Sequence, residues 1–194
     1  MKTKLLAILS IIFLATSCRK KDDVELWKIP PNVRQLLPYT EGQKITFSSP
    51  QGGSLQTTIK LSSEVTSERI SNGVRYKVEI LNYKMMIGSQ PLVEGSIGSV
   101  YVIFLSIWSP LDNYQRGGGF DVLTDDKEAK LLCNTGRQTC LPTVTLNGKT
   151  FNNVILVSGG TVNGIGDHLT KAWYTAEKGL LGFAYNNGIT YVRD

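Results

Sequence analysis

Between residues 55 and 80, apolar and polar side chains alternate in the way expected of strands with one buried face. The apolar residues fall on odd positions in the range 55–65 and on even positions in the range 74–80. A period of two residues predicts two strands, each with one face in the core and one in water. Asn72-Gly73 between them accepts the positive φ angles of a tight hairpin turn. We therefore expect the two strands to pair, with Leu61 and Val78 on the same buried face.

The range 100–108 differs because its apolar residues occupy both odd and even positions. This pattern predicts a strand that is buried on both faces. Further strands are expected at 43–49, 143–146, 149–157, 172–176, 180–185 and 189–193, with turns at Asn147-Gly148, Lys178-Gly179 and Asn187-Gly188. The total is about nine or ten strands, most of them joined by hairpins. The predicted class is all-β, as a single antiparallel sandwich or an open half-barrel that occupies residues 26–194.

One segment near the mature N-terminus has a helical pattern. Pro30-Pro31 can begin a short helix with Val33, Leu36 and Leu37 on one side, and Pro38 ends it. Elsewhere nineteen glycines and the scarcity of Ala-, Glu- or Leu-rich stretches favour strands and tight turns.

The first residues form a secretory signal. Lys2 and Lys4 precede an apolar run at 5–14, and small residues at 15–17 lead to Cys18. The run is too short to span a bilayer, so residues 1–17 are predicted to be a cleaved signal peptide. About 177 residues then remain, which suits one domain with its own core.

A cysteine directly after these small residues resembles the lipobox of bacterial lipoproteins, in which the cysteine becomes the lipidated first residue. The resemblance implies that Cys18 is the lipid anchor, although Leu14 stands four rather than three positions before it. The alternative is an ordinary cleaved signal followed by an incidental cysteine. Residues 18–25 are charged and indicate a solvated tether.

Within that tether, Lys21-Asp22-Asp23 is similar to the signal that exports lipoproteins of Bacteroidota-type bacteria to the outer face of the outer membrane. The similarity implies a lipid-anchored protein of the outer membrane, exposed at the cell surface. The alternative is that any hydrophilic tether contains charges.

Several short motifs in the remaining chain also resemble small cell-envelope lipoproteins of the Bacteroidota type. They are the proline segment ending in Leu37-Pro38-Tyr39 before Glu41-Gly42-Gln43, the Gly-Lys-x-Phe-x-Asn-Val hairpin at 148–154, and Trp173-Tyr174 before Lys178-Gly179-Leu180. All are packing and turn motifs. They imply a β domain at the cell envelope and no catalytic residue.

Candidate catalytic and metal-binding groups are few. His168 is the only histidine, so paired-histidine metal sites are excluded and a His-centred triad would depend on this one residue. The glycine-rich run at 159–166 is not followed by a lysine at P-loop spacing, which favours a flexible connection. The acids Asp125, Asp126 and Glu128 alternate with lysines and fit a solvated turn better than a Ca²⁺ site. We predict no catalytic, cofactor-binding or metal-binding residue, and a protein that is not an enzyme.

Cys133 and Cys140 lie seven positions apart in a chain predicted to be exported. If a hairpin sets them opposite each other, they can form a disulfide. Metal binding by the pair is a poor alternative because no second pair of cysteines or histidines completes four ligands.

The candidate recognition surface is the predicted loop from Trp108 to Phe120. Trp108, Tyr114 and Phe120 offer stacking faces, Arg116 offers a fork of donors, and three glycines allow adaptation. An ordinary surface loop has the same composition, so both interpretations stay open. Trp27 and Trp173 have apolar neighbours and are expected in the core.

These features predict a non-catalytic binding or accessory lipoprotein held to the membrane by its anchor, with a glycan, a peptide or another envelope protein as its ligand. The alternative is a periplasm-facing structural or lipid-carrying lipoprotein with a hollow half-barrel. The net charge of +5 is scattered along the chain, so no nucleic-acid partner is indicated.

Overall fold

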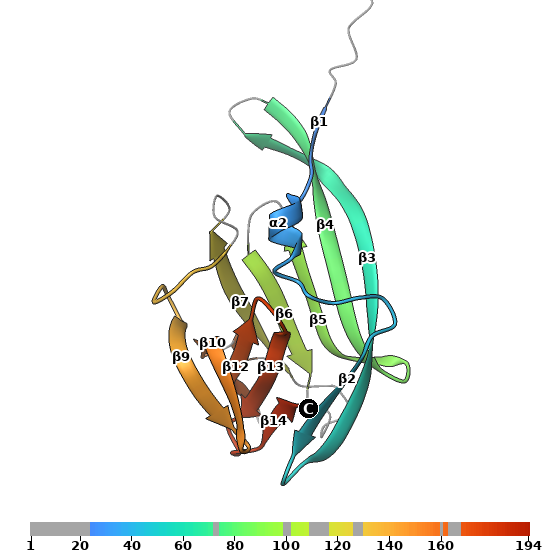
Figure 1. Cartoon of the computed structure of the whole chain (residues 1–194). Coiled ribbons are helices and arrows are strands. Elements are labelled where there is room, and N and C mark those ends of the chain that lie inside the picture. Colours follow the sequence, from blue (N-terminus) through green and yellow to red (C-terminus); the bar gives the residue numbers. More distant parts are fainter. Residues whose placement is uncertain are drawn as a thin grey trace, which may run out of the picture.

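The computed structural model describes residues 24–71, 74–98, 102–108, 117–125, 130–159, 161–162 and 168–194, and these form one curled, mostly antiparallel sheet (Figure 1). The elements in chain order are β1 (Glu25–Trp27), α2 (Pro31–Arg34), β2 (Lys44–Ser49), β3 (Gly53–Ser71), β4 (Val74–Ile87), β5 (Gln90–Gly98), β6 (Val102–Trp108), β7 (Gly117–Asp125), β8 (Lys130–Leu131), β9 (Gln138–Leu146), β10 (Lys149–Ser158), β11 (Thr161–Val162), β12 (Leu169–Thr175), β13 (Gly179–Tyr185) and β14 (Thr190–Arg193).

The strands follow the order β11-β7-β6-β5-β4-β3-β2-β14-β13-β12-β10-β9, while β1 pairs with β4 and β8 pairs with β7. The predicted all-β class is confirmed, and the half-barrel is the alternative that the structure adopts. The predicted nine or ten strands were too few, since the described residues contain fourteen.

Strand β5 is the clearest omission. Its sequence, QPLVEGSIG, lacks a regular apolar alternation because Glu94 and Gly95 interrupt it. The structure compensates at Gly95, which pairs with Tyr83 of β4. A Cβ atom on Gly95 would overlap the ring of Tyr83. The Tyr83 ring from the neighbouring strand β4 therefore fills the space that a side chain at position 95 would occupy.

The β3–β4 hairpin pairs as predicted, from Ser71 opposite Val74 onward. However, a one-residue register shift between Thr66 and Arg69 places Leu61 opposite Tyr83. Since neighbouring residues of a strand point to opposite faces, Val78 then lies on the face away from Leu61. The expected shared face was therefore wrong, because a β-bulge inverts the face assignment of β4.

Strand β6 lies between β5 and β7, but it is not buried on both faces as predicted. Ile103, Leu105 and Ile107 are buried, whereas Phe104 is 51% exposed. Strand β13 has the expected character instead, since every residue from Gly179 to Tyr185 is buried.

The predicted helical segment is reduced to the four residues of α2, and residues 25–27 before it are a strand. The one-sided burial was correct, because Val33, Leu36 and Leu37 all lie in the main core. The Ile29 amide donates to the Glu79 carboxylate at 3.0 Å, and the Arg34 guanidinium also pairs with Glu79. These contacts hold the N-terminal segment on β4.

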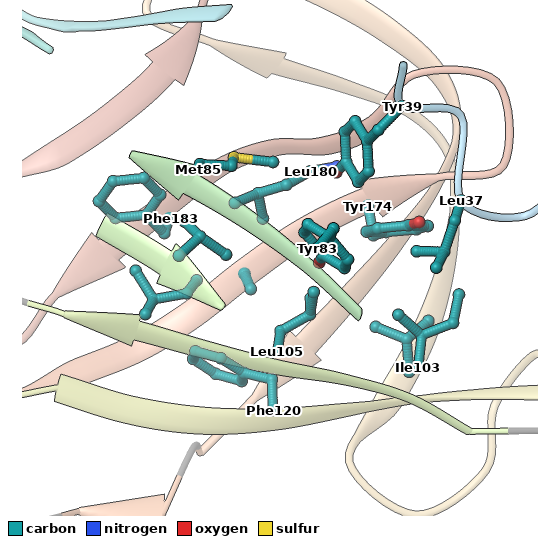
Figure 2. Close-up of a cluster of buried hydrophobic side chains, with 14 of the residues drawn as sticks. Leu37, Tyr39, Tyr83, Met85, Ile103, Leu105, Phe120, Tyr174, Leu180 and Phe183 are labelled. Carbon is teal, nitrogen blue, oxygen red and sulfur yellow. The ribbon is translucent and has the colours of Figure 1, made fainter. Parts of the chain in front are cut away.

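The main core fills the inside of the curl. Side chains of β4, β6, β7, β12 and β13 point toward one another there (Figure 2). Tyr83, Tyr174 and Tyr191 are among the largest fully buried side chains. Burial raises the pKa of Tyr83 and Tyr174 well above its usual value, so both phenols stay neutral.

A second, smaller core covers the outer face of β13. It joins Leu146, Val154, Trp173, Leu181, Ala184 and Val192. The β9–β10 hairpin supplies the first two of these residues. This hairpin crosses the outer face of the sheet, which explains why β13 is covered on both sides.

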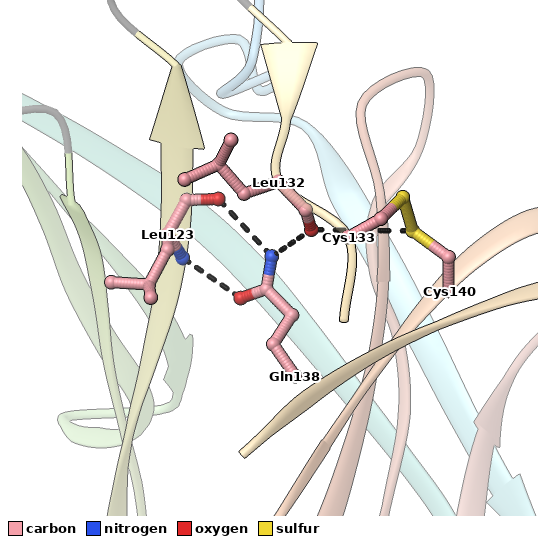
Figure 3. Close-up of a disulfide and its surroundings, with 5 residues drawn as sticks. All are labelled: Leu123, Leu132, Cys133, Gln138 and Cys140. Carbon is pink, nitrogen blue, oxygen red and sulfur yellow. Dashed lines mark hydrogen bonds between the residues drawn. A yellow bond between two sulfur atoms is a disulfide. The ribbon is translucent and has the colours of Figure 1, made fainter. Parts of the chain in front are cut away.

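The two ends of the curl are joined by one buried side chain, Gln138 of β9 (Figure 3). Its amide oxygen accepts from the Leu123 amide of β7 at 2.8 Å, and its amide nitrogen donates to the Leu123 carbonyl at 3.1 Å. The same nitrogen also donates to the Leu132 carbonyl. The side-chain amide of Gln138 therefore pairs with the backbone of β7 in the way that a neighbouring strand would.

Candidate functional site

A cleft of about 810 Å³ opens between the β9–β10 hairpin, the β12–β13 turn and the end of the α2 segment. Its size falls in the range of small-molecule sites, roughly 300–1,000 Å³. The lining residues are Leu36, Lys130, Leu131, Cys133, Cys140, Leu141, Pro142, Thr150, Phe151, Asn152, Asn153, Ile155, Thr175, Ala176, Glu177, Lys178 and Leu181.

The β9–β10 hairpin forms one wall, and its turn has the predicted chemistry. Asn147 and Gly148 both have positive φ, at 46° and 78°. The turn is fixed across the sheet, since the Asn147 side-chain amide donates to the Thr190 carbonyl at 3.2 Å. The Lys149 ammonium pairs with Asp194 at 2.7 Å. The wall is thus held at its tip as well as along its ladder.

Asn153 gives the same wall a local irregularity. Its φ of 53° is left-handed, and it stands opposite Pro142, which has no amide hydrogen to offer the ladder. Thr143 and Asn152 are joined by a side-chain hydrogen bond of 3.3 Å on the exposed face. Both Asn152 and Asn153 are exposed, so the side-chain amide of Asn153 and the amide nitrogen of Asn152 face solvent where a ligand can reach them.

The disulfide forms the second wall. Cys133 and Cys140 are bonded, with their Cα atoms 5.1 Å apart, which confirms the pairing predicted from their spacing. The bond holds the segment that follows β8 against β9 (Figure 3). Lys130 and Leu131 of β8 line the cleft beside it.

The cleft combines apolar surface with neutral polar groups and a few charges at its rim. Leu36, Leu141 and Phe151 contribute apolar surface to its lining. The Lys178 ammonium lies 5.9 Å from the centroid of the Phe151 ring, which is a cation–π distance. The site can therefore offer an apolar surface, amide donors and acceptors, and cations to one ligand.

The predicted recognition loop is shorter than expected. Trp108 ends β6 and pairs with Gly117, the first residue of β7. Phe120 belongs to β7 and is buried in the main core, so it is not a ligand platform. Tyr114 and Arg116 lie outside the described residues.

Other predicted residues are placed as follows. Cys18 lies outside the described residues. Trp173 is buried as predicted, but Trp27 is 45% exposed, so its assignment to the core was wrong. Trp27 is exposed because β1 pairs only with β4, in the part of the β3–β4 hairpin that β5 does not reach. Its ring is covered on one side by Tyr76, with 4.6 Å between the ring centroids.

The described part of the chain contains neither a candidate metal site nor a candidate membrane-spanning helix. In these residues no three His, Cys, Asp or Glu side chains are grouped in a way that could hold a metal ion. Asp125 is described, whereas Asp126 and Glu128 are not. None of the described helices has the length and apolar character needed to cross a membrane.

Sequence reasoning missed the cleft because its residues come from five separate elements. A partial signal was present: the Gly-Lys-x-Phe-x-Asn-Val hairpin contains Phe151 and Asn153, and Lys178-Gly179 forms the turn across from it. From the sequence alone, both motifs predict only turns and packing.

Comparisons of the chain with protein-family models, with curated proteins and with solved structures gave no match.

Proposed function

We propose that this chain is a lipid-anchored, non-catalytic binding protein of the outer membrane, exposed at the cell surface, and that it holds a short glycan in the cleft beside the disulfide. The observation that carries the proposal is the cleft itself. It has the volume of a ligand site, and it sets the Phe151 ring beside the exposed amides of Asn152 and Asn153.

A glycan fits this arrangement better than a purely apolar ligand. Sugars present C–H faces that pack on aromatic rings and hydroxyl groups that bond with side-chain amides. Thr150 and Thr175 extend the row of neutral hydrogen-bonding groups along the cleft. Lys130 and Lys178 at its rim favour a glycan that carries an acidic group.

The sequence supports binding without catalysis, because a single histidine leaves little material for a general base with an orienting partner. The lipid-carrying alternative requires a hollow interior. In the described residues the inside of the curl is occupied by a packed cluster that includes Tyr83, Tyr174 and Phe183. We therefore prefer a ligand on the outer cleft.

The test is a glycan array probed with the purified protein, followed by calorimetry with the best ligand. Asn153→Gly is the sharpest variant, because glycine accepts the left-handed backbone and removes only the amide. Losing one or two hydrogen bonds should weaken binding about five- to tenfold. Thr139→Ala is the matched control, since Thr139 is exposed on β9 outside the cleft.

The same assay separates the cleft from the loop of the sequence-based hypothesis. If Tyr114→Ala and Arg116→Ala weaken capture while Asn153→Gly and Asn152→Ala do not, the loop is the recognition surface and the cleft proposal is wrong. If no ligand is captured by the native protein at all, binding of glycans is rejected.

The anchor is tested independently. Cys18→Ala should abolish palmitate labelling and release the protein from the membrane fraction, because the acyl chains supply the membrane affinity. Protease treatment of intact cells should remove the domain. Changing Lys21, Asp22 and Asp23 to Ala should protect it; unchanged exposure would contradict the export signal.

A further inference from the structure

Exposed apolar side chains gather at one end of the molecule. Among the described residues, the large apolar side chains that are exposed are Leu26, Trp27, Val65 and Phe104, at 41–53%. The first three lie on β1 and on the part of β3 that projects with β4 beyond the rest of the sheet (Figure 1). We call β1 and these projecting parts of β3 and β4 the arm.

The arm is an ordered, three-stranded structure. Trp27 pairs in parallel register with Val78, and Val65 pairs with Glu79 on the other side of β4. The Trp27 ring is stacked on Tyr76, with an angle of 17° between the planes. Its exposure is thus a fixed feature of the fold rather than the result of a loose side chain.

Apolar groups occur on both faces of the arm. Leu26 and Trp27 are neighbours on one strand, so their side chains point in opposite directions. A protein-docking patch needs one continuous face. A projection with apolar side chains on both faces suits immersion of its end in an interfacial layer, where tryptophan and tyrosine are enriched.

The position of the tether identifies that layer. Val24, the first described residue, follows Cys18 by six positions and Trp27 follows it by nine. An extended chain spans at most about 3.3–3.6 Å per residue, which keeps Val24 within about 20 Å and Trp27 within about 30 Å of a lipidated Cys18. The arm therefore stays close to the bilayer surface whenever the anchor is inserted.

Charge around the arm fits lipid headgroups. Lys28 follows Trp27 directly in the chain, and Lys77 of β4 lies opposite Leu26; both lysines are exposed. The carboxylate of Glu79 is neutralised by Arg34. Lysines close to an aromatic pair, here Trp27 and Tyr76, are a combination that favours binding to an anionic membrane surface.

We propose that the arm docks on the headgroup region of the membrane that holds the anchor, with Trp27 at the interface, so that the cleft is held in a set orientation above the bilayer. This inference depends on the lipid anchor of the proposed function. It does not depend on the ligand of the cleft.

The test uses the protein purified from membranes and reconstituted in vesicles of phosphatidylcholine and phosphatidylglycerol, with or without bromine on the acyl chains. Bromolipid should quench part of the tryptophan emission, and Trp27→Phe should lose that part. Phe104→Ala is the matched control, because Phe104 is similarly exposed but lies on β6, and it should keep the quenching. Circular dichroism confirms that each variant is folded.

Mass spectrometry of the purified protein separates the two proposals. If Cys18 is not acylated, the anchor is rejected, and the free thiol is then coupled to a maleimide lipid so that docking is still measured. Equal quenching in the native protein and Trp27→Phe, or none in either, overturns the docking. If the tryptophan emission instead changes with the density of protein on the vesicles and not with bromolipid, the arm contacts a second copy of the chain. That result would also overturn the proposed docking on the membrane.

Discussion

Strands β13 and β1 belong to the same sheet but have opposite surroundings. Every residue of β13 is buried, since the main core covers its inner face and the β9–β10 hairpin covers its outer face. In β1, Leu26 and Trp27 are 41% and 45% exposed. The difference shows that this sheet is stabilised by what packs on it and not by strand pairing alone, so changes in the body and in the arm should have very different costs.

The largest effect is expected at the joint between the ends of the curl. Gln138→Ala leaves the Leu123 amide without its partner and removes one hydrogen bond from each of the Leu123 and Leu132 carbonyls, although the Leu123 carbonyl still accepts from the Leu132 amide at 3.0 Å. We expect this to cost about 2–4 kcal/mol in the free energy of unfolding. Urea unfolding measures the loss, and hydrogen exchange at Leu123 should accelerate. Gln56→Ala, at an exposed position on β3, is the control and should stay within about 0.5 kcal/mol. Equal effects of the two changes would refute the bridging role.

The disulfide comes next. Cys133 and Cys140 close a loop with a sequence separation of 7, for which the chain-entropy model gives about 2.5 kcal/mol. The double change to Ala should lower the melting temperature, and dithiothreitol should lower that of the native protein but not of the variant. A native protein insensitive to reduction would contradict this assignment.

Gly95→Ala tests the packing of tyrosine on glycine in the body. The added methyl group overlaps the Tyr83 ring, and such overpacking costs about 1–3 kcal/mol. Gly98 lies on the same strand, where a Cβ atom would meet its nearest neighbour at 3.6 Å, an ordinary contact. Thermal unfolding should therefore separate the two alanine variants. Similar melting temperatures would mean that Tyr83 can move aside.

Glu79 tests the connection between the body and the arm. Its burial alone would raise the pKa, but the Ile29 amide and Arg34 outweigh this and lower it below 4.5. Because the pKa of Glu79 is lower in the folded protein than in the unfolded chain, its charged form stabilises the fold at pH values above the unfolded pKa. This stabilisation is lost as the pH falls through the folded pKa. Glu79→Gln should cost about 1–2 kcal/mol at pH 7 and less at pH 3. A cost that does not change with pH would rule out the charged pairing.

The smallest effect is expected in the arm itself. Leu26→Ser changes a side chain that is already 41% exposed, so we expect less than about 0.5 kcal/mol in chemical unfolding. Leu105→Ser, in the main core, is the comparison and should cost several kcal/mol because it buries a hydroxyl and leaves a cavity. If Leu26→Ser is costly as well, the arm is stabilised by burial and the contrast with the body disappears.

Local chemistry explains which parts of the fold were predictable. The Asn147-Gly148 turn, the pairing across residues 72–73 and the Cys133–Cys140 bond each depend on residues close in sequence. The inverted face of β4 depends on a bulge between Thr66 and Arg69, where no glycine or proline marks it. Alternation in the sequence therefore placed Ile59 and Val78 correctly in buried positions, but it was wrong for Val65, which is 53% exposed, and for the relation of the two strands across the bulge.

The candidate site was harder to predict for a related reason. Phe151, Leu131 and Lys178 meet only because the hairpin crosses the sheet and the disulfide draws β8 toward β9. Composition pointed instead to the aromatic loop, where Phe120 proved to be a core residue. A cleft assembled from distant segments leaves little periodic signal in any one of them.

The pairing of β2 with β14 has a consequence for the order of events in the cell. Ser48 of β2 lies opposite Val192 of β14. One edge of β2, an early strand in the chain, is therefore covered only when β14, the last strand, has formed. Contacts between such distant segments form slowly. A chain that emerges from synthesis N-terminus first would thus keep this edge of β2 open until its final residues appear.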